Sequence, residues 1–300
     1  MQYIKNLADN YPKLNNPINI DIVVEGGVFN GIYSTGALML VKELEKRNYF
    51  KVHRISGSSV GSIMSFLYLC DRLELLPNDF KKIRNCFKKT LTLKEIEKII
   101  FNHTKSLTDE EFDIINNKLY IAYTKNGERK IRYTYKSKKD VGETILRSIH
   151  VPYLTSGTFY REKKGNNYLD GGMPFIFDNR DKSDRKILYL NNSALNSMFT
   201  VKKELNGHGR MLEGAIDAHN YLLHNRKGFL TSFIQNWNIY DYFILRLKQF
   251  IYFILIFLSY YMEKYGKELL LPMIKNLDIY KQLKSFFIEV VRDIVLLKCL

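Results

Sequence analysis

One serine of the chain stands in a G-x-S-x-G pattern, Gly57-Ser58-Ser59-Val60-Gly61. The pattern lies between a stretch that predicts a strand, 52–56, and a stretch that predicts a helix, 60–70. A nucleophile on so tight a strand-to-helix turn needs small neighbours two residues away on either side. The helix N-terminus would also favour an oxyanion formed there. We interpret Ser59 as a nucleophile; the motif alone leaves open a glycine turn in which Ser59 caps the helix.

A second glycine-rich segment, Glu25-Gly26-Gly27-Val28-Phe29-Asn30-Gly31, also follows a predicted strand and precedes a predicted helix. Glycines at such a position expose backbone N–H groups toward a negative oxygen. A phosphate-binding P-loop is excluded, because Ile32 and Tyr33 stand where Lys and Ser or Thr are required. The segment makes sense as an oxyanion loop if a nucleophile faces it, and Ser59 follows the next strand.

A third pattern, Tyr168-Leu169-Asp170-Gly171-Gly172, puts an aspartate at the end of a short strand. By itself, an aspartate before two glycines is often only a turn. Three histidines follow it, His208, His219 and His224, so a Ser-Asp-His order has to be considered. Ser59 follows only the second predicted strand, which is too early for an α/β-hydrolase nucleophile. We therefore expect the histidines to be ordinary surface or core residues.

In this order, the glycine loop, G-x-S-x-G and D-G-G resemble the patatin-like phospholipase family, whose members use a Ser-Asp dyad. Residues 147–153, RSIHVPY, resemble the short helix and proline turn that precede D-G-G in that family. The resemblance covers about residues 18–225. It implies that Ser59 is the nucleophile and Asp170 the base, without a metal or an organic cofactor, and that the oxyanion is bound by the loop residues Gly26, Gly27, Val28, Asn30 and Gly31.

Two loop positions depart from the family pattern, which is close to G-G-G-x-[Lys/Arg]-G. Val28 replaces the third glycine and Asn30 replaces the basic residue. Val28 still has an N–H group, and an asparagine amide can still donate a hydrogen bond, although the cation beside a phosphate-bearing substrate is lost. We therefore expect activity to be retained.

The elements predicted around the motifs form a parallel sheet with helices on both faces. Strands are expected at 18–25, 52–56 and 131–136 and from Lys186, and helices at 32–47, 60–70 and 141–150. Residues 71–120 read as polar helices, with a capping box at Thr108 and Glu111. The fold class is thus a three-layer α/β/α patatin-like domain with a mostly parallel sheet, residues 18–228. A lead-in, 1–17, precedes it, and an aromatic-rich helical extension, 229–300, follows.

The composition points to a polyanionic partner. Of 300 residues, 46 are Lys or Arg and 31 are Asp or Glu, which gives a net charge of +15. Hydrophobic residues make up 46%, which excludes a disordered chain. Aromatic residues concentrate toward the C-terminus, and the cations follow no recognised nucleic-acid motif. We expect an anionic membrane surface as partner and no nucleic acid; the oligomeric state is left open.

The location is expected to be intracellular, either cytoplasmic or membrane-associated. The first 17 residues contain no secretory leader. The three cysteines, Cys70, Cys86 and Cys299, show no metal-ligand or redox spacing, so no disulfide is expected.

The extension contains an uncharged run, 249–262, QFIYFILIFLSYYM. As a helix, these 14 residues extend about 21 Å, short of the roughly 30 Å of a bilayer core. A buried or in-plane amphipathic helix is therefore favoured over a spanning one. A last helix, 281–298, carries an apolar stripe of Leu283, Phe287, Val290, Ile294 and Leu297.

The resemblance carried by these patterns implies a lipid acyl hydrolase that cleaves acyl esters of phospholipids or acylglycerols. The alternative is a protein of the same fold that is catalytically weak or inactive and acts as a membrane-associated binding or structural module.

Overall fold

The computed structural model describes residues 2–27, 31–90, 92–178, 184–192, 206–224, 228 and 230–265. A mixed sheet lies at its centre, in the order β5-β6-β3-β2-β1-β7-β8, with β4 paired to β3. Strands β3, β2, β1 and β7 are parallel, and the remaining pairs are antiparallel. The strands are β1 (Ile18–Val24), β2 (Phe50–Gly57), β3 (Leu119–Lys125), β4 (Glu128–Arg132), β5 (Arg161–Lys163), β6 (Asn166–Leu169), β7 (Lys186–Leu190) and β8 (Thr231–Phe233).

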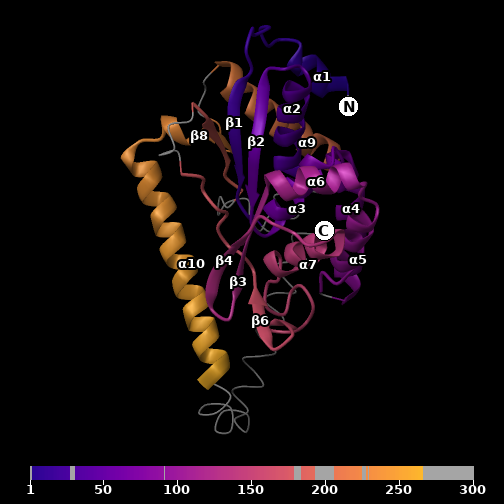
Figure 1. The fold of residues 1–300 in the computed structure, drawn as a ribbon, viewed down its shortest axis with the longest axis vertical. Coiled ribbons are helices and arrows are strands. Elements are labelled where there is room, and N and C mark those ends of the chain that lie inside the picture. Colours follow the sequence, from indigo (N-terminus) through magenta and orange to yellow (C-terminus); the bar gives the residue numbers. More distant parts are fainter. Residues whose placement is uncertain are drawn as a thin grey trace.

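Helices cover both faces of this sheet. The α-helices are α1 (Gln2–Ala8), α2 (Gly31–Lys46), α3 (Val60–Leu69), α4 (Leu76–Thr90), α5 (Glu95–Lys105), α6 (Asp109–Lys118), α7 (Lys138–Ser148), α9 (Gly207–His224) and α10 (Ile239–Tyr265). Two short 3-10 turns are η1 (Leu73–Leu75) and η3 (Ile234–Asn236). Figure 1 shows α10 running along one side of the sheet, with α3 to α7 on the other side.

Strand β1 separates two hydrophobic cores. Its residues Ile20, Ile22 and Val24 belong to the larger core, together with apolar side chains of α2, α3 and α7. Val23 points to the other face, where the smaller core includes Tyr189 of β7 and Leu245 of α10. A central parallel strand is expected to be buried on both faces in this way. The predicted three-layer α/β/α class is therefore confirmed.

Most elements that carry the motifs agree with the sequence predictions. Helices α2 and α3, strands β1, β2 and β7, and helix α7 lie within a few residues of the predicted ranges. The predicted capping box is also present: the Glu111 backbone N–H donates to Thr108 Oγ1 at 3.1 Å, and the Thr108 N–H donates to Glu111 Oε2 at 2.8 Å. At this position the local sequence pattern alone predicted correctly where the helix begins.

The sequence predictions missed one strand and misplaced another. The helical region predicted at 71–120 is present and ends at Lys118, but strand β3, which follows it, was not predicted, because its apolar run is too short to indicate a strand by its period. The strand expected at 131–136 is instead β4, which ends at Arg132. Tyr135 leaves the sheet because its N–H donates to Asn116 Oδ1 at 2.6 Å and its hydroxyl donates to the Leu119 carbonyl at 3.2 Å.

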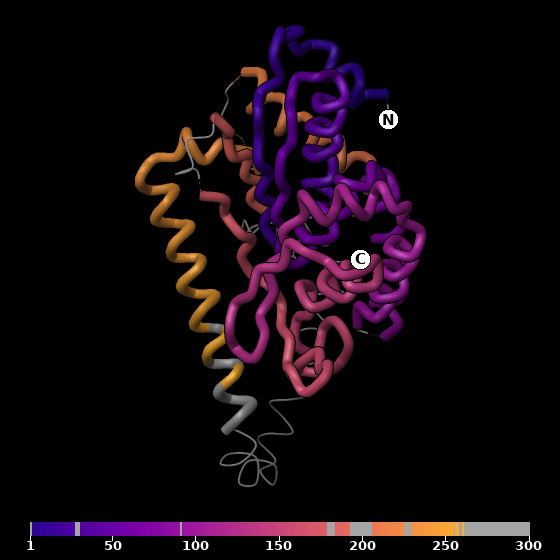
Figure 2. The backbone as a smooth tube through the Cα atoms, in the orientation of Figure 1, coloured from indigo at the N-terminus to yellow at the C-terminus, as the bar shows by residue number. Residues whose placement is uncertain are grey.

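The predicted extension begins with residues that add to the sheet. Strand β8 pairs with β7 at its edge, and the 249–262 run lies within α10. In Figure 2, α10 passes the turn between β3 and β4, where a β-carbon on Gly127 would be 3.7 Å from the Tyr260 ring. Within the described ranges, no helix has the combined length and apolar content needed to cross a bilayer. The last predicted helix, 281–298, lies outside the described residues.

Parallel strands bring their carboxyl ends to one edge of the sheet, and the glycine loop and the serine turn follow β1 and β2 there.

On the large-core side, α2 crosses α9 at two glycines. A β-carbon on Gly214 would lie 1.8 Å from the Tyr33 carbonyl oxygen, and one on Gly36 would lie 1.8 Å from that of Met211. The crossing therefore depends on backbone packing against backbone.

Replacing Gly214 with Ala should lower the free energy of unfolding by about 1–3 kcal/mol, because α2 and α9 must separate. The matched control is Gly207→Ala in the first turn of α9, where a β-carbon would come no closer than 3.3 Å to Pro77. Alanine should be neutral or stabilising there, because it favours a helix more than glycine does. Urea unfolding of both variants measures the difference, and equal losses would contradict the account of the crossing.

Candidate active site

Ser59 occupies a strained turn between β2 and α3. Its backbone has φ 51° and ψ −134°, a region that residues with a side chain rarely adopt. Although Ser59 is the residue before the first turn of α3, its side chain makes no capping hydrogen bond. The helix-cap interpretation of the motif is therefore not supported. Strained backbone with a side chain not used for capping is typical of a functional position.

The glycine loop touches this turn directly. A β-carbon on Gly26 would lie 2.8 Å from Cβ of Ser59, and one on Gly61 would lie 2.4 Å from the Val24 carbonyl oxygen. Gly27 follows Gly26 and packs against Asn192, whereas Gly31 begins α2. The predicted loop residues Val28 and Asn30 lie outside the described residues.

Ser148, at the end of α7, joins the strands and loops that meet here. Its buried hydroxyl accepts the Ser59 backbone N–H at 3.0 Å and donates to the Ala122 carbonyl of β3 at 2.7 Å. Its carbonyl accepts the Gly171 N–H at 3.0 Å. Ser59 and the D-G-G segment are thus held by the same residue.

Asp170 follows β6, and its backbone N–H donates to the His150 carbonyl at 2.8 Å. Oδ1 accepts the Gly172 N–H at 2.7 Å. Oδ2 is buried and has no hydrogen bond of standard geometry to the described residues. The residue as a whole is partly exposed, but its carboxyl is buried, and burial raises the pKa of Asp170 to about 6. The nearby Ser59 hydroxyl and the Gly172 N–H both favour the ionised carboxyl and oppose that rise in pKa.

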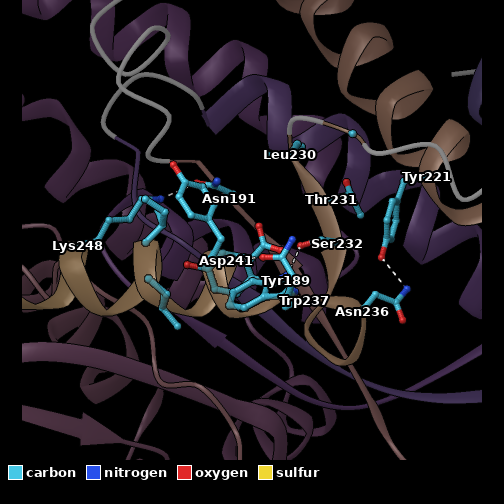
Figure 3. Close-up of a pocket in the computed structure, with 15 residues that line it drawn as sticks. Tyr189, Asn191, Tyr221, Leu230, Thr231, Ser232, Asn236, Trp237, Asp241 and Lys248 are labelled. Carbon is cyan, nitrogen blue, oxygen red and sulfur yellow. Dashed lines mark hydrogen bonds between the residues drawn. The ribbon is translucent and has the colours of Figure 1, made fainter.

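Helix α10 contacts both loops with its inner face. The Tyr252 hydroxyl donates to the Asp170 carbonyl oxygen, and the Tyr252 ring fills the space that a β-carbon on Gly172 would need. One turn earlier, Lys248 Nζ lies 3.3 Å from Oε1 of Glu25, which is fully buried before the glycine loop. Lys248 also donates to Asn191 Oδ1 at 3.0 Å (Figure 3). Residues of the predicted extension therefore help to hold the two loops of the site in place.

An apolar cavity of about 80 Å³ opens beside Ser59. Most of its lining side chains come from α3, α4, α5 and the segment after α7. The lining consists of Gly31, Ser59, Val60, Ile63, Leu76, Phe80, Ile83, Leu93, Ile96, Ile149, Val151, Leu154 and Thr155. Such a surface can take an aliphatic chain but offers almost nothing to a polar ligand.

A larger cavity of about 630 Å³ lies between α10, β7 and β8, and Figure 3 shows its lining. Neither Ser59 nor Asp170 is among the described residues that line it. The histidines do not line the Ser59 cavity either, within the described part of the chain. His219 packs against Tyr11 and His224, with ring centroids 5.4 and 5.8 Å apart.

Three residues of this arrangement were not found from the sequence: Ser148, Lys248 and Tyr252. Ser148 lies in the 147–153 segment used for the family resemblance, but nothing in that segment singles out its hydroxyl. Lys248 stands directly before the uncharged run, and nothing in the sequence indicates that Glu25 is its partner. Tyr252 is one aromatic residue among many in that run.

The raised pKa of Asp170 has a consequence for stability. Between about pH 4 and pH 6, the folded carboxyl keeps a proton that the unfolded chain has released, so stability falls as the pH rises through this range. A shift of about two units corresponds to roughly 3 kcal/mol. Asp170→Asn should therefore be more stable than the original protein by about 2–3 kcal/mol above pH 7, and this advantage should shrink below pH 4.

Chemical unfolding at both pH values measures this advantage. Asp113→Asn, at an exposed position of α6, is the control and should show no such pH dependence. An advantage of Asp170→Asn that is the same at both pH values would contradict the buried carboxyl.

The segments that form this site resemble those of a known protein family. No curated protein matches the chain. A family model described as patatin-like phospholipase matches residues 22–181. The match contains the glycine loop, the serine turn and the D-G-G segment, and it extends over more than half of the chain. The chain belongs to the patatin-like phospholipase family.

Proposed function

We propose that the protein is a serine esterase of the phospholipase A or lipase type, which hydrolyses acyl esters of lipids at Ser59. The observation that carries the proposal is that a strained serine, a carboxyl of raised pKa and an apolar cavity meet at one point. Membership of the family supports lipid acyl hydrolysis in general. The strain supports Ser59 in particular, because it is kept at a cost to the fold.

In this mechanism, the Ser59 hydroxyl attacks the acyl carbonyl carbon while Asp170 accepts its proton. N–H groups of the loop formed by Gly26, Gly27, Val28, Asn30 and Gly31 hold the tetrahedral oxyanion, together with the N-terminus of α3. The intermediate collapses to an acyl-enzyme, and the protonated Asp170 gives its proton to the leaving alcohol. Water then attacks the acyl-enzyme while Asp170 accepts its proton, and the second tetrahedral intermediate collapses as Asp170 returns that proton to Ser59 Oγ, which releases the fatty acid.

The environment of Asp170 suits this role. A base must be ionised at the working pH, yet a carboxylate of ordinary pKa is too weak to take a proton from a hydroxyl. Burial raises the pKa of Asp170 to about 6, so the group is stronger as a base and still ionised at neutral pH. The Gly172 N–H fixes Oδ1, which leaves Oδ2 for the serine proton.

The apolar cavity is the proposed acyl site. Its volume of about 80 Å³ is small beside ligand pockets of about 300–1,000 Å³. A long acyl chain therefore requires the side chains of α4 and α5 to move away from those of 149–155. Leu76, Phe80 and Ile83 form the α4 side of this wall.

Ser59→Ala should abolish labelling by a fluorophosphonate probe and hydrolysis of a soluble ester, because it removes the proposed nucleophilic oxygen. Asp170→Asn should lower kcat by several orders of magnitude, since an amide cannot accept the proton. The matched control is Ser65→Ala on α3, whose hydroxyl faces the Ser56 carbonyl at 3.4 Å. It should retain labelling. Labelling of the intact protein at another serine would refute the proposal, and no labelling would favour the non-catalytic alternative.

Ile83→Trp should shorten the acyl chain that the protein accepts, because the larger ring fills the cavity at α4. The ratio of kcat/KM for palmitoyl to acetyl esters should fall about tenfold or more. Ile114→Trp, at an exposed position of α6, is the control and should leave the ratio unchanged. An unchanged ratio for Ile83→Trp would exclude this cavity as the acyl site.

A further inference from the structure

Helix α10 exposes apolar side chains on the outer face that is polar in an ordinary surface helix. Of the fifteen large hydrophobic side chains that are exposed in the described residues, ten lie on α10. They are Ile239, Tyr240, Tyr242, Phe243, Leu247, Phe250, Ile251, Phe253, Ile254 and Phe257. The polar side chains Lys248 and Tyr252 point inward, to Glu25 and Asp170. An exposed apolar surface of this extent marks an interaction site.

The width of this surface helps to identify its partner. At 100° per residue, the ten side chains cover roughly 180° of the helix circumference. A two-helix seam needs only a narrow stripe, whereas a helix lying in a lipid interface buries a broad face.

Charge favours an anionic interface. Between Ile239 and Phe257, Asp241 is the one acidic residue, and it forms hydrogen bonds with the backbone and side chain of Asn238 at the helix start. Arg246 is exposed among the apolar side chains, where its long stem lets the guanidinium reach lipid headgroups. The chain as a whole carries +15. An anionic bilayer supplies both the apolar layer and the opposite charge.

We propose that the outer face of α10, formed by these ten side chains and Arg246, binds an anionic lipid bilayer in the plane of its interface. The inner face of the same helix holds Glu25 and the Asp170 segment, so the bound helix keeps the site at the lipid surface. The proposal does not require Ser59 to be catalytic.

The test measures co-sedimentation of the full-length protein with phosphatidylcholine vesicles that contain or lack phosphatidylserine. Every variant also carries Ser59→Ala, so that lipid is not consumed and the result is independent of hydrolysis. The protein should bind the anionic vesicles more tightly than the neutral ones, and added salt should weaken this binding. Absence of binding to anionic vesicles would overturn the proposal.

A matched pair of double variants locates the surface. Ile251→Ser/Ile254→Ser changes side chains that are 49% and 36% exposed on α10, and Ile114→Ser/Ile216→Ser changes side chains that are 43% and 41% exposed on α6 and α9. The first pair should lower vesicle affinity about tenfold or more, and the second should leave it unchanged. Equal effects of the two pairs would overturn the proposal. Cooperative melting shows that each variant is folded.

Other occupants of this face give different results. If a second copy covers it, light scattering in solution will show a dimer that Ile251→Ser/Ile254→Ser dissociates, without an effect on vesicle binding. If residues 266–300 cover it, the same variant will lower the melting temperature and leave vesicle affinity unchanged. Should that variant not fold, Arg246→Gln serves instead: the proposal requires weaker binding to anionic vesicles and unchanged binding to neutral ones, and any other pattern refutes it.

Discussion

A single buried hydroxyl, that of Ser148, sets the relation between the two halves of the site. It accepts the N–H of Ser59 and donates to the carbonyl of Ala122, while the Ser148 carbonyl accepts the N–H of Gly171. A buried N–H without an acceptor costs about 1–3 kcal/mol, so the turn of Ser59 cannot drift from α7 without loss. Because α7 also ends at this residue, the helix, strand β3, the serine turn and the D-G-G segment share one fixed point.

Around that point, close packing at two glycines leaves no room for a side chain. A β-carbon on Gly171 would be 2.0 Å from the Ala122 carbonyl oxygen, and one on Gly26 would meet Ser59. On the outer side, Tyr252 and Lys248 contact the two loops from α10. Helices on both faces of the sheet therefore contact the site. A displacement of α10 would change its contacts with Glu25 and with the Asp170 segment at the same time.

The residues that could be predicted are those whose type is dictated by chemistry or by space. Ser59 and Asp170 could be singled out as candidates because a tight turn demands glycines at fixed positions, which leaves a local pattern. The supporting residues leave no such pattern, since Ser148 acts on a residue 89 positions away and Lys248 on one 223 positions away. Strand β3 was missed because five apolar or small residues have no clear period. For α10, composition indicated an interfacial or buried helix. Which side of the helix faces outward could not be predicted, because it depends on the distant partners of Lys248 and Tyr252.

The backbone of Ser59 carries a further consequence. Its φ of 51° is one that glycine adopts freely, and holding a serine there costs on the order of 1–3 kcal/mol. Stability alone would therefore drive this position toward glycine over generations of mutation. A lineage that kept the fold but no longer needed the hydroxyl would accept glycine here readily, because that change relieves the backbone strain. If Ser59 is the nucleophile that we propose, the identity of this one residue in a descendant of the chain records whether that chemistry is still under selection.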